Sequence, residues 1–133
     1  MLQPHLFCKP IAKTPVDREA LLEIALSGNP KVMFGSDSAP HPQEAKENCG
    51  CAAGVFTAPI ALQVLAQIFN ENGKLNNLQN FVSGNASKIY NLQPSSKSIT
   101  LIEKDFVVPE LYQYNGLKVI PMYAGEKIKW SIE

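Results

Sequence analysis

An acid and an imidazole stand four residues apart in the stretch G-S-D-S-A-P-H, at Asp37 and His41. A carboxylate can carry a proton or bind a metal ion, and an imidazole can bind an anionic substrate. The stretch follows Lys31–Phe34, a short apolar run that predicts a buried strand. Because α/β proteins bind ligands beyond the carboxyl ends of their strands, this position predicts that Asp37 lies in an active site.

Each of these residues also has a purely structural interpretation. Asp37 can close an Asx turn with Ser38, and His41 can be an exposed loop histidine. The stretch Cys49–Gly54 is rich in small residues, which permit either tight packing or close approach of backbone amides to a ligand. The local sequence leaves these alternatives open.

Helical patterns flank the candidate strand. Thr14 as N-cap, with proline at the first helical position, predicts a helix over Pro15–Ser27. A second helix is expected from Thr57 or Pro59 to Gly73, with the apolar stripe of Ile60–Ile68 in the core. Two short helical pieces are expected at Leu78–Ser83 and Ala86–Tyr90. The aperiodic segment 35–55 predicts a long polar loop, and such a loop is usually either functional or disordered.

The pattern changes to period two beyond Pro94. Ser98–Glu103 and Glu126–Ile132 partly alternate polar and apolar residues, as half-exposed antiparallel strands do. Trp130 is expected to anchor their packing. The chain is therefore expected to be α/β, with the barrel-type elements in residues 1–95 and a terminal β appendage in 96–133.

Composition restricts the partners that the chain can have. Twelve basic and twelve acidic residues give a formal net charge of zero, so no basic patch favours nucleic acid or a membrane surface. The apolar stretches are too short to span a bilayer, and the first residues do not have the pattern of a secretory signal. The three cysteines are odd in number and include a C-G-C pair rather than C-x-x-C. These features predict a reduced cytoplasmic protein.

Four separate motifs then carry a resemblance to a known family. They are P-H-L-F-C-K-P at 4–10, F-G-S-D-S-A-P-H at 34–41, K-E-N-C-G-C-A at 46–52, and A-G-E at 124–126 with Trp130. Together and in this order, they resemble the C-terminal part of a dihydroorotase. The similarity is to the compact single-function bacterial and fungal type, within the metal-dependent amidohydrolase superfamily. It implies the C-terminal segment of a TIM-like (β/α)₈ barrel.

The resemblance also implies roles for individual residues. Asp37 would end the last barrel strand, contact a binuclear zinc centre and carry the proton between the hydroxide and the departing nitrogen. His41 would bind the substrate carboxylate, while Lys9 and Ala52 would bind the pyrimidine ring mainly through their backbone. The reaction would interconvert carbamoyl aspartate and dihydroorotate in de novo pyrimidine biosynthesis.

The chain differs from the family pattern in its extent. A complete barrel typically needs about 250 residues, whereas this sequence shows one clear candidate strand and a second candidate at Leu6–Cys8. The family's paired histidines, bridging lysine and further histidine ligands are absent, and His5 and His41 do not replace them.

Two functional hypotheses follow from this difference. The first is a dihydroorotase part that needs the remaining N-terminal barrel portion, is inactive alone and forms a homodimer when complete. The alternative is a non-catalytic α/β binding or assembly module derived from a dihydroorotase. Asp37 and His41 favour the first hypothesis, and the missing metal ligands favour the second for the isolated chain.

Overall fold

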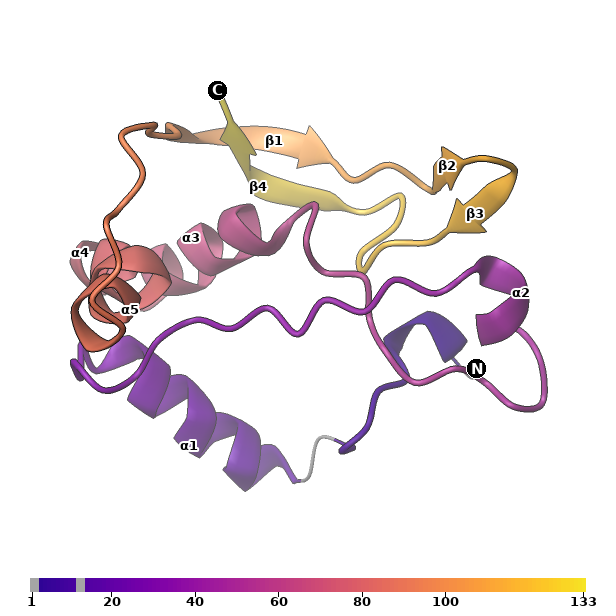
Figure 1. Ribbon diagram of the computed structural model, residues 1–133, viewed down its shortest axis with the longest axis horizontal. Coiled ribbons are helices and arrows are strands. Elements are labelled where there is room, and N and C mark those ends of the chain that lie inside the picture. Colours follow the sequence, from indigo (N-terminus) through magenta and orange to yellow (C-terminus); the bar gives the residue numbers. More distant parts are fainter. Residues whose placement is uncertain (1–2, 12–13) are drawn as a thin grey trace. The chain divides into compact units, whose positions relative to one another are not determined.

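A computed structural model of the protein describes residues 3–11 and 14–133 (Figure 1). Met1 and Leu2, which belong to the start examined for a secretory signal, lie outside the described residues. None of the helices in the described part is long and apolar enough to cross a membrane. The chain divides into two compact units. Residues 1–12, 36–61 and 105–128 form what we call the loop unit, and residues 13–35, 62–104 and 129–133 form the helical unit.

Two of the expected helices are confirmed. Helix α1 (Pro15–Leu26) begins with a capping box, in which Thr14 Oγ1 accepts from the Asp17 amide and the Asp17 carboxylate accepts from the Thr14 amide. These bonds satisfy backbone donors that a helix start leaves without intrahelical partners. Helix α3 (Ala61–Glu71) lies inside the range predicted for the second helix.

The two short helical pieces form part of one longer helical stretch. Helix α4 (Leu75–Gln79) passes directly into the π-helical turn η2 (Asn80–Gly84) and then into α5 (Asn85–Ile89). The stretch therefore begins earlier than the sequence pattern indicated. The Asn85 side chain is buried, and its Nδ2 donates to the carbonyls of Asn29 and Val32 at 3.1 and 2.7 Å.

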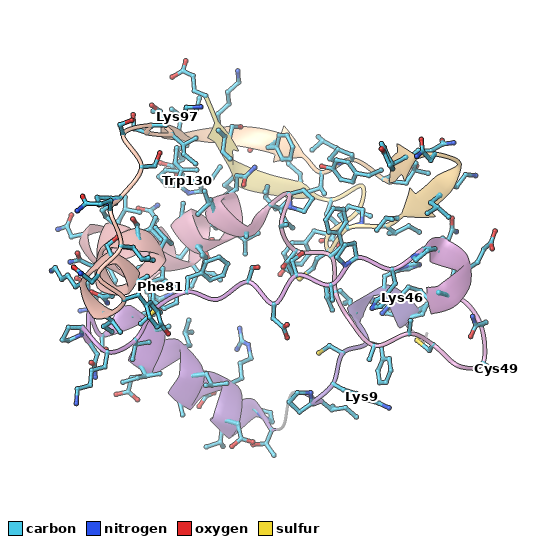
Figure 2. The ribbon with its side chains drawn as sticks, in the orientation of Figure 1. Lys9, Lys46, Cys49, Phe81, Lys97 and Trp130 are labelled. Carbon is cyan, nitrogen blue, oxygen red and sulfur yellow. The ribbon has the colours of Figure 1, made fainter. Side chains whose placement is uncertain are left out.

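The helical unit is organised around one apolar cluster. Its buried members are Leu26, Ala66, Phe69, Leu78 and Trp130. The Phe69 and Phe81 rings lie 5.3 Å apart between centroids, a separation typical of favourable aromatic pairs. Leu65 and Ile68 pack against the cluster from α3. The core assignments of the Ile60–Ile68 stripe and of Trp130 are therefore confirmed; Phe81 and Trp130 are labelled in Figure 2.

The prediction of a strand at Lys31–Phe34 is wrong, because the structure has no strand in that run. A strand requires a neighbouring strand that accepts its backbone hydrogen bonds. Here the Val32 amide donates to Asn29 O within a turn at 3.0 Å, and the Phe34 amide donates to Phe81 O at 2.8 Å. The backbone of this run is therefore satisfied by a turn and by the helical stretch.

The prediction of a second strand at Leu6–Cys8 is also wrong. Pro4–Leu6 form a 3₁₀ turn, η1, and the Phe7 amide donates to Pro4 O at 3.1 Å. Proline favours such a turn because its ring fixes φ near the helical value. The segment then continues without regular structure to Ile11.

The terminal β structure contains one pair of strands that was expected and one that was not. Strands β1 (Leu101–Val107) and β4 (Lys127–Ile132) form a two-stranded sheet, close to the predicted ranges. Strands β2 (Tyr112–Tyr114) and β3 (Leu117–Val119) form an antiparallel hairpin that the alternation did not reveal. Asn115-Gly116 connects them with φ values of 49° and 81°, and this dipeptide is the strongest short hairpin signal.

Candidate functional site

The stretch that carries Asp37 and His41 is anchored on the segment that precedes α3. Ser38 Oγ accepts hydrogen bonds from the amides of Thr57 and Ala58 at 3.1 and 3.0 Å. The Ala39 amide donates to Val55 O at 3.0 Å. These three bonds fix the backbone directly after Asp37, although no regular strand supports it.

Asp37 is exposed and has a left-handed backbone, with φ of 42°. Aspartate is among the few residue types that tolerate this region. Within residues 3–11 and 14–133, no group donates a hydrogen bond to its carboxylate, and the Ser38 amide instead donates to Ser36 Oγ at 3.3 Å. The geometry therefore assigns the local turn to Ser36 and leaves the Asp37 carboxylate open to a ligand.

His41 is partly buried, so the alternative of an exposed loop histidine is wrong. Its Nε2 lies 3.0 Å from Ala53 O, within the small-residue stretch that follows C-G-C. A nitrogen facing a carbonyl acts as donor, which leaves the other ring nitrogen for a different partner. The bond joins the G-S-D-S-A-P-H stretch to the C-G-C-A loop.

Gly54 explains how the two loops approach so closely. Its φ is +148°, and a Cβ there would lie 2.6 Å from Ala39 Cβ and 2.9 Å from His41 Cδ2. Contacts that short are not tolerated without movement of the backbone. The small-residue stretch therefore permits close packing of protein against protein at this position.

Lys46 is a buried charged residue that begins the K-E-N-C-G-C-A motif but for which the sequence predicted no role. It ends the short helix α2 (Gln43–Lys46) inside the long loop and is only 3% exposed. Its Nζ donates to the carbonyls of Phe7, Ala52 and Gly54 at 2.9, 2.7 and 2.7 Å. Figure 2 shows this side chain beside the loop segments that it joins. Lysine is seldom fully buried, so only its place before the C-G-C-A loop could have drawn attention to it.

The other two predicted site residues lie on segments tied to Lys46. Ala52 donates its amide to Ala45 O at 2.8 Å and accepts from Lys46 at its carbonyl. A ligand would therefore meet the second lone pair of that carbonyl. Lys9 is exposed, and its Nζ lies 5.8 Å from the centroid of the Phe7 ring, two residues earlier. The structure thus connects the segments of Lys9, His41 and Ala52.

A hollow of about 670 Å³ also lies in the loop unit. It is lined mainly by apolar atoms of Gln3, Pro4, Leu6, Phe7, Lys46, Glu47, Asn48, Cys49 and Cys51. It includes Phe7 and Lys46 but none of the four predicted site residues. At its edge, His5 Nε2 and Glu47 Oε1 lie 2.8 Å apart. This hydrogen bond is the larger cause, and one from Gln43 the smaller, of a Glu47 carboxyl pKa below its ordinary value.

The described residues do not fit a complete zinc site. No group of three or more histidine, cysteine, aspartate or glutamate side chains within 3–11 and 14–133 is placed to hold a metal ion. The three cysteines are free thiols. A structural or catalytic zinc ion needs at least three protein ligands, and Asp37 could supply one.

Comparison with known proteins connects this geometry to one enzyme family. No family model matches the chain. Dihydroorotases from Acinetobacter baumannii and Halorhodospira halophila are 45% and 46% identical to it over 131 and 132 residues, which are 97% and 98% of this chain and 38% of each relative. The chain therefore spans about 38% of the length of these relatives.

Two solved structures show the same likeness in three dimensions. A crystal structure of dihydroorotase from Saccharomyces cerevisiae, in complex with 5-fluoroorotic acid, matches with a TM-score of 0.94 and 40% identity over 98% of this chain. The dihydroorotase of Campylobacter jejuni matches with a TM-score of 0.89 and 52% identity over 99% of this chain. The chain covers 38% of each structure.

These similarities confirm two of the expectations. The resemblance to dihydroorotases is confirmed, and so is the fold class, because the α/β chain has the structure of one part of a dihydroorotase. They also favour a dihydroorotase part over the alternative of a non-catalytic binding module.

Proposed function

We propose that this chain supplies the proton-transferring and substrate-binding part of a dihydroorotase-type cyclic amide hydrolase. The reaction is the interconversion of carbamoyl aspartate and dihydroorotate, a step of de novo pyrimidine biosynthesis. One observation supports this most directly: the 3.0 Å contact between His41 Nε2 and Ala53 O, which joins the two loops that carry the family motifs. A structural remnant would not need an acid and an imidazole on loops held together in this way.

Asp37 is the catalytic residue of the proposal. Its open carboxylate takes a proton from the oxygen nucleophile as that oxygen attacks the ring amide carbon. The C–N bond then breaks, and the same carboxyl group gives the proton to the departing nitrogen. The reverse sequence closes the ring of carbamoyl aspartate. The Asp37 side chain is exposed, and the hydrogen bonds of the turn are formed by Ser36 and Ser38 instead.

His41, Lys9 and Ala52 bind and orient the substrate. His41 donates one ring N–H to Ala53 O, so its orientation is fixed. In the imidazolium form the second nitrogen also carries a proton, which it can donate to the substrate carboxylate. The Ala52 carbonyl and the backbone at Lys9 hold the ring. Positioning of this kind lowers the barrier because the reacting atoms meet in a productive geometry.

The proposal includes zinc as cofactor of the complete enzyme, with Asp37 as one ligand. Since the described residues of this chain do not form a metal site, the other ligands would come from the remaining N-terminal portion of the barrel. The complete enzyme would be cytoplasmic and homodimeric, with small-molecule substrates and neither nucleic acid nor membrane as partner. The division into barrel elements at 1–95 and a β appendage at 96–133 is part of the same proposal.

A chimera tests this function. In it, this chain replaces the matching part of the Campylobacter jejuni dihydroorotase, whose 52% identity favours correct packing. We expect the purified chimera to hydrolyse dihydroorotate, measured beside the unaltered Campylobacter enzyme. A folded, zinc-loaded chimera without turnover would refute the proposed function.

The isolated chain gives the complementary result. We expect negligible stoichiometric zinc by elemental analysis and no hydrolysis of dihydroorotate, because one carboxylate cannot hold a catalytic metal centre. Near-stoichiometric zinc together with turnover would show that the 133 residues contain a complete site, and the requirement for further ligands would be wrong.

A further inference from the structure

We propose that Lys46 is a positioning residue, whose buried ammonium sets the spacing between the substrate-binding segments around Lys9, His41 and Ala52. This inference rests on the proposed function and extends it to a residue that does not itself contact the substrate. The three carbonyl contacts of its Nζ carry the argument.

Because the Lys46 side chain is buried, its ammonium donors must find hydrogen-bond acceptors within the protein. Moving an ammonium out of water is costly unless every donor finds an acceptor. Lys46 is 3% exposed, and its three N–H donors meet three backbone carbonyls at 2.7 to 2.9 Å. The charge is thus stabilised by carbonyl dipoles that belong to the loops themselves, so the ammonium and the loop geometry depend on each other.

The three acceptors lie next to the predicted substrate contacts. Phe7 comes two residues before Lys9, and Ala52 is itself a predicted contact. Gly54 follows Ala53, whose carbonyl holds His41. The Gly54 amide also donates to Phe7 O at 2.9 Å, so this carbonyl accepts from both Lys46 and the loop. Removal of the ammonium would leave the bond from the Gly54 amide as the remaining hydrogen bond to Phe7 O.

The geometry favours lysine over residues of similar size. An ammonium is a compact charge with three donors that point in different directions, whereas the arginine donors lie in one plane. Methionine has nearly the length of lysine without donors, so Lys46→Met removes one donor from each of the three carbonyls and leaves Phe7 O with the Gly54 amide alone. The Lys46 Nζ also lies over the Phe7 ring, 5.9 Å from the ring centroid.

The kinetic test uses Lys46→Met, Lys46→Arg and Lys118→Met in the chimera. Lys118 is an exposed lysine of β3 in the same unit and is not the donor to any of the three loop carbonyls, so its substitution removes the same charge and keeps those three bonds. We expect Lys46→Met to raise KM for dihydroorotate about tenfold or more, the size of one lost charged hydrogen bond. The change in kcat should be smaller, because Asp37 is not held by Lys46. The KM of Lys46→Arg should fall between those of Lys46→Met and the unsubstituted chimera. The KM of Lys118→Met should equal that of the unsubstituted chimera.

A second readout does not depend on activity. Amide hydrogen exchange at Gly54, measured on the 133-residue chain, should be faster in Lys46→Met than in the unsubstituted chain and unchanged in Lys118→Met. If the unsubstituted chimera is inactive, the proposed function fails, and the proposed substrate positioning by Lys46 fails with it; the exchange result then decides only whether Lys46 holds the loops together.

Two results would overturn the inference. One is an unchanged KM in Lys46→Met with unchanged exchange at Gly54. The other is a loss of kcat and zinc with KM unaffected, because that pattern describes a general structural role. If Lys46→Met does not fold, Lys46→Arg decides: a raised KM with retained zinc supports positioning, and an unchanged KM excludes it.

Discussion

The apolar cluster of the helical unit and the candidate-site loops of the loop unit are each stabilised internally by a different kind of interaction. The helical unit packs Phe69, Leu78 and Trp130 into one apolar cluster, with Phe81 stacked against it. The loop unit also buries Ile60, Val108 and Ile128. The loops of its candidate site, however, are joined by polar contacts, in which Lys46 and Ser38 bond to backbone groups of neighbouring loops. Apolar packing forms a scaffold that tolerates some variation, whereas hydrogen bonds to specific carbonyls fix particular loop positions.

Backbone conformation follows the same division. Five non-glycine residues in the described ranges 3–11 and 14–133 have a positive φ: Asp37, Cys51, Asn115 and Tyr123 in the loop unit, and Asn91 in the helical unit. Such conformations persist only where surrounding contacts enforce them. Asp37 and Cys51 lie in the two family motifs, so the strained backbone coincides with the candidate site. The candidate site is therefore specified by loop hydrogen bonds more than by the end of a strand.

The largest expected effect is a loss of packing in the helical unit. Phe69 is 1% exposed, so Phe69→Ala should lower the free energy of unfolding by about 3–5 kcal/mol through lost burial and a residual cavity. Urea unfolding of the chain measures this. Leu21→Ala, at a position 69% exposed on α1, is the matched control and should change stability little. Equal losses in the two variants would contradict the role of the apolar cluster.

A backbone change in the loop unit should have a smaller effect on stability and a distinct effect on the site. Gly54→Ala places a Cβ 2.6 Å from Ala39 Cβ at a φ of +148°. We expect a cost of about 1–3 kcal/mol in unfolding free energy and a raised KM in the chimera, because His41 must move. Gly35→Ala is the control for stability, since a Cβ there meets nothing within 4 Å. An unchanged KM in Gly54→Ala would show that the spacing of the loops does not matter.

The smallest effect concerns pH and the His5–Glu47 contact. The hydrogen bond from His5, with a lesser one from Gln43, lowers the pKa of Glu47, so the folded state favours the carboxylate. Its stabilisation is therefore full above the ordinary carboxyl pKa and is lost as pH falls through the lower folded value. The difference in Tm between the chain and Glu47→Gln should shrink from pH 7 toward pH 3. A difference that stays constant, or that matches Glu44→Gln, would exclude this contribution.

The sequence predicted those elements that local signals determine. Thr14 and Pro15 mark the start of α1, and the spacing of Leu65 and Ile68 marks the buried face of α3. The Asn115-Gly116 signal for the β2–β3 hairpin was present as well, although period-two alternation alone did not reveal it. Asp37 and His41 were identified because their types and motif are visible in the sequence.

The remaining features depend on contacts between distant residues. Lys31–Phe34 has the composition of a strand, yet its amides bond to a turn and to Phe81, so no strand forms. The burial of Lys46 depends on carbonyls up to 39 residues away, which no local pattern records. The packing of Gly54 against Ala39 and His41 is hidden for the same reason.

The most direct test of the central claim separates Asp37 from His41 in the chimera. Asp37→Asn keeps the shape and the tolerated backbone but cannot carry the proton, so kcat should fall about 10²-fold to 10⁴-fold while zinc and substrate binding persist. His41→Ala should act mainly on KM, with any fall in kcat reporting poorer positioning. Both constants and the zinc content should be measured for each variant. Near-normal turnover in zinc-loaded Asp37→Asn, or unchanged constants in His41→Ala, would mean that G-S-D-S-A-P-H is only a structural turn.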